Sequence, residues 1–384
     1  MASPSVKIWD LPDEILCYIF SKLNAKFVIR SIMLVCTRWQ SVVEENYIFW
    51  VTIEAVIDCD SFLGRSYLHE TNTRWEGKEI LIGEKDVEKI SKVQNFKFIE
   101  GSMILDKSIS LLLEIFEIIN TNCKNIKKIE FFNCIGVTSY EAVRFLTANY
   151  RNSITEVSFG VNEFTDGLYR FPCDEVSKFV NLKRLVCHDT MFQSDNLYDL
   201  CENCEHLDSL WILYCTSLES DALMYFLEKK KQVLKQLGIG VLLNDCILNK
   251  LNKCHNLEAL FVANAGSISD ICIRSFAQQS NLRYFSLQQA NIKQDTLADL
   301  VSCNRKLGVF KYLKILDMTG HYQWCNDERI YPNLFEEECC TSKRHDQTHI
   351  RVIYNNRMNF KQRSYSSSIS HWMFGSLRYF DSNW

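Results

Sequence analysis

Two stripes of apolar side chains at helical spacing run through the first fifty residues. The first stripe follows a Leu-Pro-Asp-Glu segment, in which Pro12 suits a first helical turn and the acids Asp13 and Glu14 suit its positive end. Its apolar members are Leu11, Ile15, Leu16, Ile19, Phe20 and Leu23. This spacing predicts an amphipathic helix that begins near Pro12.

The second stripe predicts another helical stretch, broken in two near Met33. Its members are spaced by threes and fours and are Val28, Ile32, Val35, Cys36, Trp39, Val42 and Val43. Between residues 8 and 50, 26 of 43 residues are apolar, against 47% for the whole chain. Because units below roughly 60 residues bury too little surface to be comfortably stable, we expect the surplus apolar residues to meet a partner.

Downstream, a Leu-x-x-Leu-x-Leu pattern recurs and predicts a repeat array. Its starts are Val93, Ile126, Ile154, Leu182, Leu207, Leu234, Leu257, Leu282 and Leu313. A period in the twenties is typical of leucine-rich repeats, in which each unit is a short strand, a turn and a helix. The copies at Ile154 and Leu234 depart from the pattern, so the repeat boundaries there are open. Cys123, Cys204, Cys254 and Cys303 recur near helix ends, and Cys134 and Cys215 at the turn after a strand, as small packing residues.

The predicted fold class is therefore α/β, a leucine-rich repeat solenoid of short parallel strands plus helices, preceded by a small all-helical unit. No repeat buries its apolar face alone, so stacking creates the core. The expected divisions are a flexible N-terminus (1–7), the helical unit (8–50), a connecting segment with the start of the solenoid (51–92), the repeats (93–320) and a C-terminal cap or tail (321–384).

The helical unit closely resembles the F-box family along the full length of that motif. The resemblance is carried by Leu11-Pro12, Glu14, Ile15-Leu16, Ile19-Phe20, Val35-Cys36-Thr37-Arg38-Trp39 and Trp50. It implies that this surface binds a Skp adaptor and, through it, a cullin scaffold. The implied adaptor-binding residues are Leu11, Pro12, Ile15, Leu16, Ile19, Phe20, Leu23, Val35, Cys36, Trp39 and Trp50. The alternative is that they fill a private core of a helical cap on the solenoid.

On each repeat strand, alternation places the third, fifth and seventh positions on the concave face. The substrate-binding residues predicted from this rule are Arg184, His188, Trp211, Leu213, Phe261, Tyr284 and Gln288. The aromatic residues stand out, because aromatic side chains and arginine most often anchor protein interfaces. The alternative is that these side chains pack against one another or against the C-terminal tail.

Composition narrows the class of function. A net charge of −4 and a pI near 6.1 do not favour nucleic-acid binding. Neither an export signal nor an 18-residue apolar run is present, so we expect no membrane partner and a cytoplasmic or nuclear location, in which the 17 cysteines stay reduced.

Sequence motifs for catalysis are absent. The pair Cys201 and Cys204 lacks a second ligand pair, and Cys339-Cys340 with His345 and His349 is a poor metal set. We therefore expect no catalytic residue, metal or cofactor. With the family resemblance, the sequence predicts a non-catalytic substrate-recognition subunit of a Skp-cullin-F-box ubiquitin ligase that directs a protein substrate to ubiquitination and proteasomal degradation. A non-degradative scaffold and an enzyme with an unrecognised cysteine site are the alternatives.

Overall fold

The computed structural model describes a subset of the 384 residues. The described ranges are 7–23, 27–28, 31–45, 50, 53–59, 79–81, 91–99, 105–132, 140–160, 171–188, 192–213, 218–265, 268–279, 281–287, 296, 315–317 and 351–353. The chain forms two compact units, residues 1–161 and 162–384. Each unit is described by itself.

The first unit opens with short helices. They are η1 (Ile8–Asp10), α1 (Asp13–Lys22), η2 (Ile32–Leu34) and α3 (Thr37–Glu45). Pro12 is the N-cap of α1, and Asp13 and Glu14 occupy its first turn, as the sequence predicted. The predicted break near Met33 is also confirmed, because the chain turns between η2 and α3.

These helices enclose a small apolar core. The rings of Phe20 and Trp39 meet edge to face with centroids 5.3 Å apart. The indole Nε1 of Trp50 donates a hydrogen bond to the Val43 carbonyl oxygen at 2.9 Å. The buried side chains are Leu16, Phe20, Val28, Ile32, Trp39, Val42, Val43 and Trp50. Both predicted stripes therefore contribute to one core.

The rest of the first unit is a parallel sheet with helices. Its strands are β1 (Glu54–Asp58), β2 (Glu79–Leu81), β3 (Asn95–Ile99), β4 (Lys128–Phe132) and β5 (Glu156–Gly160), in the order β5-β4-β3-β1-β2. Helix α6 (Leu105–Asn122) follows β3, and α7 (Tyr140–Tyr150) follows β4. Phe98, Phe131 and Phe159 lie in register on neighbouring strands, with centroids 5.2 and 5.7 Å apart, and form the centre of this core.

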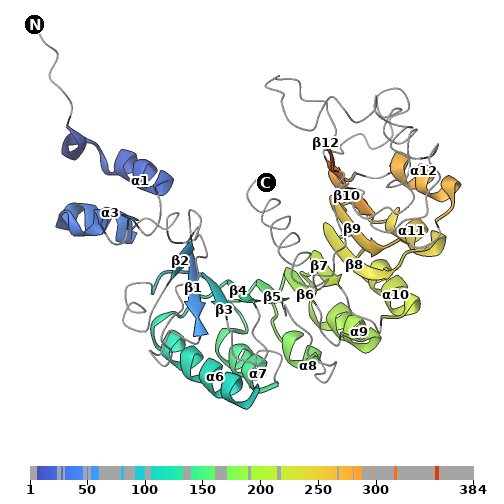
Figure 1. The fold of residues 1–384 in the computed structure, drawn as a ribbon, viewed down its shortest axis with the longest axis horizontal. Helices are drawn as coiled ribbons and strands as arrows, with labels where there is room; N and C mark the ends of the chain where they lie inside the picture. Colours follow the sequence, from blue (N-terminus) through green and yellow to red (C-terminus); the bar gives the residue numbers. More distant parts are fainter. Residues whose placement is uncertain are drawn as a thin grey trace, which may run out of the picture. The chain divides into compact units, whose positions relative to one another are not determined.

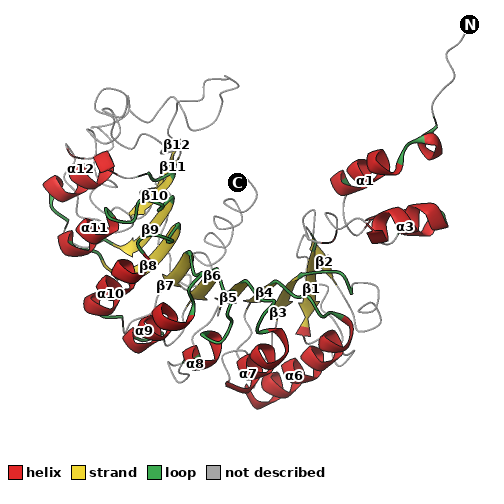
Figure 2. Ribbon diagram, turned by 180° about the vertical axis from the view of Figure 1, so that it is seen from behind, coloured by secondary structure: helices red, strands yellow, loops and turns green. Residues whose placement is uncertain are grey.

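The second unit repeats the same plan. Its parallel strands are β6 (Arg184–His188), β7 (Ser209–Leu213), β8 (Gln236–Leu242), β9 (Ala259–Asn264), β10 (Tyr284–Leu287), β11 (Ile315–Asp317) and β12 (Arg351–Ile353), paired in sequence order. Its helices are α8 (Cys173–Val176), α9 (Ser194–Asn203), α10 (Ser220–Lys230), α11 (Asp245–Leu251) and α12 (Asp270–Gln279). Figures 1 and 2 show these helices along one face of the strands.

The predicted repeat starts match the observed strands closely. Each of the nine strands from β3 to β11 begins two residues after a predicted start, for example β7 at Ser209 after Leu207. The irregular copy at Leu234 contains a register shift between Ile239 and Leu242, where β8 pairs with β9. The solenoid-like α/β fold with a helical N-terminus is confirmed. Strands β1, β2 and β12 were not predicted, since β1 and β2 lie in the expected connecting segment and β12 lies in the expected C-terminal tail.

Candidate functional site

An apolar surface remains exposed on the N-terminal helices after their core is filled. Exposed fractions reach 45% for Ile15, 61% for Trp9, 59% for Val35 and 79% for Leu34. The full set of exposed large apolar residues in this part of the chain is Ile8, Trp9, Ile15, Tyr18, Leu23, Phe27, Leu34 and Val35. Because exposed apolar side chains in such density usually mark an interaction site, this set, named the outer face, is the first candidate site.

The structure divides the eleven residues that the sequence implied for adaptor binding. Pro12, Ile15, Leu23, Val35 and Cys36 are exposed, and Leu11 and Ile19 are half-buried. For the other four the structure corrects the sequence analysis, because their side chains fill the helical core and are buried: Leu16, Phe20, Trp39 and Trp50. They support the outer face rather than belong to it.

Sequence reasoning missed five residues of the outer face, which are Ile8, Trp9, Tyr18, Phe27 and Leu34. Ile8 is 41% exposed, and the other four are more than half exposed. Each is apolar but lies off both helical stripes. An apolar side chain outside the stripe that faces the core was the signal available in the sequence, because such a side chain points away from the core.

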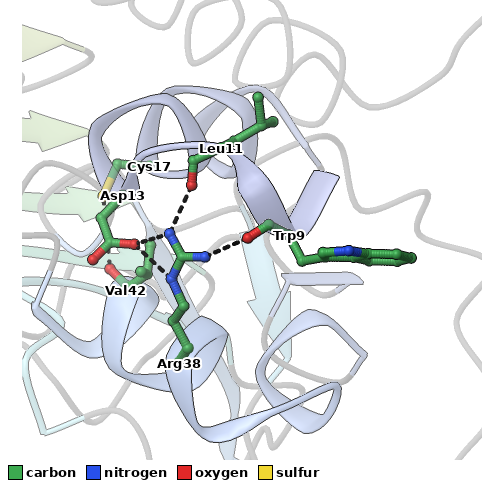
Figure 3. Close-up of polar contacts among 6 residues, drawn as sticks. All are labelled: Trp9, Leu11, Asp13, Cys17, Arg38 and Val42. Carbon is green, nitrogen blue, oxygen red and sulfur yellow. Dashed lines mark hydrogen bonds and ion pairs between the residues drawn. The ribbon is translucent and has the colours of Figure 1, made fainter. Parts of the chain in front are cut away.

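Arg38 joins α3 to the start of α1 (Figure 3). Its Nη1 donates to the Trp9 carbonyl oxygen at 2.6 Å, and its Nη2 donates to the Leu11 carbonyl oxygen at 2.6 Å. Its Nε and Nη2 also donate to Asp13 Oδ1, at 2.9 and 2.6 Å. The guanidinium therefore fixes the backbone of residues 9–13, in which Trp9 and Pro12 are exposed.

The second candidate site is the sheet face opposite the helices of the second unit. Trp211 on β7, Gly238 on β8 and Phe261 on β9 are neighbours in register. An ideal Cβ on Gly238 would lie 2.1 Å from Cε3 of Trp211, so the indole lies directly over this glycine. The ring also packs against Phe261, with centroids 6.2 Å apart. The glycine provides the room that the indole occupies.

This packing agrees with the alternative that the aromatic side chains of this face pack against one another. Trp211, Phe261 and Tyr284 are only 2–3% exposed, and Leu213 is buried too. The indole Nε1 of Trp211 donates to Ser209 Oγ at 3.2 Å, and that hydroxyl donates to Gln236 Oε1 at 3.0 Å. Arg184 is half-buried, whereas the His188 side chain and Gln288 lie outside the described residues. The assignment of these residues to substrate binding stays a prediction.

The corresponding face of the first unit carries a cluster of charged side chains. Lys128 Nζ lies 3.3 Å from Glu54 Oε1 and 3.8 Å from Glu130 Oε2, and Lys97 Nζ lies 3.9 Å from Glu130 Oε1. The side chains of Lys97 and Glu130 are nearly buried. Two lysines and two glutamates balance one another, so this cluster is a compensated ion-pair network.

The sequence of the helical unit also matches a known protein family. Residues 8–54 match the F-box-like family model. These residues are the F-box-like domain, and the match covers the buried core, the outer face and Arg38 alike. No curated protein sequence matches the chain. Among solved structures, the chain is similar to the crystal structure of the Rad7 and Elc1 complex in yeast, with 11% identity over 89% of this chain and 92% of that one and a TM-score of 0.45.

Outside the F-box-like domain, cysteines pack between the repeats. Cys123, Cys204 and Cys254 are buried where their repeat helices end, whereas Cys134, Cys215 and Cys303 lie outside the described residues. Tyr150 Oη donates to the Cys123 carbonyl oxygen at 3.2 Å, and Lys230 Nζ donates to that of Cys204 at 2.6 Å. In both cases the next helix of the same unit satisfies a backbone carbonyl at the end of the preceding one.

Burial also controls the chemistry of these thiols. It raises the pKa of Cys123 and of Cys201 to about 12, and that of Cys204 and of Cys254 to about 11. A thiolate is the reactive form of cysteine, so these thiols stay protonated and unreactive at neutral pH. Within the described ranges no group of three or more His, Cys, Asp or Glu side chains is placed to hold a metal ion, and Cys339, Cys340, His345 and His349 fall outside them.

We expect the native protein to show two classes of thiol towards iodoacetamide. The exposed Cys36 and Cys246 should be alkylated first, and Cys123, Cys201, Cys204 and Cys254 only when the protein unfolds or the pH approaches 11. Because burial raises the pKa of these thiols, the free energy of unfolding should also fall above pH 9, where the thiols of the unfolded chain ionise and those of the folded chain do not. Peptide mass spectrometry after alkylation at pH 7 and pH 9 measures how far each thiol is labelled. Rapid labelling of Cys201 at pH 7 would contradict the prediction of two classes.

Among the helices that the structure describes, none is both long and apolar enough to cross a membrane.

Proposed function

We propose that the chain is the substrate-recognition subunit of a Skp-cullin-F-box ubiquitin ligase. The outer face of the F-box-like domain binds a Skp adaptor and, through it, a cullin. The solenoid holds a protein substrate, which the assembled ligase marks for proteasomal degradation. In this role the chain is itself non-catalytic, needs no cofactor, and acts in the cytoplasm or nucleus.

One observation supports the proposal that the domain binds an adaptor. The domain fills its core with Leu16, Phe20, Trp39 and Trp50 and still leaves Ile15, Val35 and Leu34 largely exposed. A domain of this size is only marginally stable, and the exposure of so much apolar surface to water is unfavourable. Burial of this surface against a partner accounts for its presence. The match of residues 8–54 to the F-box-like family supports the identity of that partner as an adaptor of the Skp type.

Substitutions of Ile15 and Val35 on the outer face, together with the neighbouring exposed Pro12, test the proposal. We expect the triple variant Pro12→Ala, Ile15→Ser, Val35→Ser to lose at least roughly tenfold in affinity for a purified Skp adaptor, since each exposed anchor contributes of order 1 kcal/mol. Its melting temperature should be almost unchanged, because all three side chains are exposed. Ser41→Ala, on the exposed side of α3, is the matched control and should bind like the natural chain. Equal binding by the triple variant and the control would overturn adaptor docking by this face.

A second experiment separates degradation from scaffolding. Partners labelled by proximity in cells should accumulate when the proteasome is inhibited. They should also accumulate when the triple variant replaces the natural chain, because substrate is then held without a ligase. Partners whose abundance responds to neither treatment would favour the non-degradative scaffold.

A further inference from the structure

The exposed Trp9 lies in a segment that is not anchored by burial. The 3-10 helix η1, which contains Trp9, has no buried residue. Its own hydrogen bonds run between Lys7 and Asp10, within the segment, and the Lys7 ammonium lies over the Trp9 ring at 5.6 Å. These local contacts do not tie the segment to the helices behind it.

Arg38 makes that connection. It is 29 residues away in sequence from Trp9, and it donates to the carbonyl oxygens of Trp9 and Leu11 while its other N–H groups hold Asp13 Oδ1. Figure 3 shows the guanidinium between the Asp13 carboxylate and the two carbonyl groups, with the Trp9 indole pointing away from the cluster. The planar fork of arginine spreads five N–H donors over three nitrogen atoms and so reaches two carbonyl groups and a carboxylate at once, whereas lysine has three donors on a single nitrogen.

We propose that Arg38 is a positioning residue for adaptor binding: it pre-orders the Trp9–Pro12 segment so that Trp9 and Pro12 already face the adaptor. This inference rests on the proposed function. A pre-ordered anchor loses less conformational entropy on association than one that is ordered only on contact. Asp13 is part of the device, since its carboxylate orients the guanidinium.

Because Arg38 and Asp13 are exposed, an effect of Arg38 on the position of the segment can be distinguished from an effect on folding. The side chains of Arg38 and Asp13 are 43% and 60% exposed, and ion pairs that exposed contribute little to stability. Loss of Arg38 should therefore leave the helical core folded while freeing the segment in front of it. An effect on adaptor binding without an effect on melting is the signature of positioning.

The experiment measures affinity for a purified Skp adaptor and the melting temperature in parallel. We expect Arg38→Ala to weaken binding about tenfold, Arg38→Lys by several-fold because the ammonium cannot reproduce the fork, and Asp13→Asn by a similar or smaller factor. Gln40→Ala is the control, because Gln40 is exposed on the same helix and its side chain bonds to Glu44 alone among the described residues. It should bind like the natural chain.

A double-mutant cycle with Trp9→Ala tests the positioning itself. If Arg38 acts by presenting Trp9, then Arg38→Ala should cost much less affinity in the Trp9→Ala background than in the natural chain. Equal costs in both backgrounds, or binding by Arg38→Ala within twofold of the control, would overturn this inference. Absence of adaptor binding by the natural chain would instead overturn the proposed function, so the two failures are distinguishable.

Discussion

Replacing Phe20 by alanine is expected to unfold the F-box-like domain and leave the second unit of the chain folded. Phe20 is 1% exposed, and its ring meets Trp39 edge to face at the centre of the helical core. Removal of a buried phenylalanine side chain costs about 3–5 kcal/mol. A domain of this size has little more stability than that, so the loss should exceed its reserve.

Hydrogen exchange measured by mass spectrometry resolves this effect along the chain. In the Phe20→Ala variant, peptides from α1 and α3 should lose protection, and peptides from β6 to β10 should keep it. Tyr18→Ala is the matched control, because Tyr18 lies on the same helix with 64% of its side chain exposed, and its removal should change stability by less than about 0.5 kcal/mol. Unchanged protection of α1 in the Phe20→Ala variant would mean that the observed core does not hold the domain together.

The second large effect is expected from Gly238→Ala. The new methyl group would lie 2.1 Å from Cε3, 2.7 Å from Cδ2 and 2.9 Å from Cζ3 of Trp211. The rigid indole has little room to move, because it is 2% exposed, contacts Phe261 and donates a hydrogen bond to Ser209. Overpacking of this kind costs about 1–3 kcal/mol, and the shortness of the contact places the expected loss near 3 kcal/mol.

The cause is tested in a double-mutant cycle by chemical denaturation. In a Trp211→Ala background the obstacle is gone, so Gly238→Ala should be neutral or stabilise by about 0.4–1 kcal/mol through the unfolded state. A loss that is the same with and without Trp211 would place the effect in the backbone of Gly238 rather than in the indole.

The same glycine differs in size from its neighbours in register on the adjacent strands. At the equivalent position of the other strands in this row stand larger residues, Val186, Trp211 and Phe261. Gly238 takes no space of its own, and the indole from the preceding strand fills the gap. The need for glycine at this position cannot be read from β8 alone, because Trp211 lies 27 residues earlier in the sequence.

By itself the sequence determined the class of fold and most of its strands. The start of α1 after Pro12, the break near Met33 and the positions of nine strands were all predictable. Capping chemistry and side-chain periodicity act over a few neighbouring residues, so they can be read without knowledge of the rest of the chain. The F-box resemblance of residues 8–50 was recognisable for the same reason, because its motif is contiguous, and the family match covers residues 8–54.

Only the tertiary structure decided which apolar residues are inside and which are outside. Within one stripe Leu16 and Phe20 are buried but Ile15 is exposed, and Trp211 is covered where the pattern predicted an exposed anchor. The clamp of Arg38 on Trp9 and Leu11 likewise joins residues 27 to 29 positions apart. Periodicity gives the direction of a side chain relative to its own helix or strand, whereas burial and hydrogen bonding depend on groups that other elements bring to it.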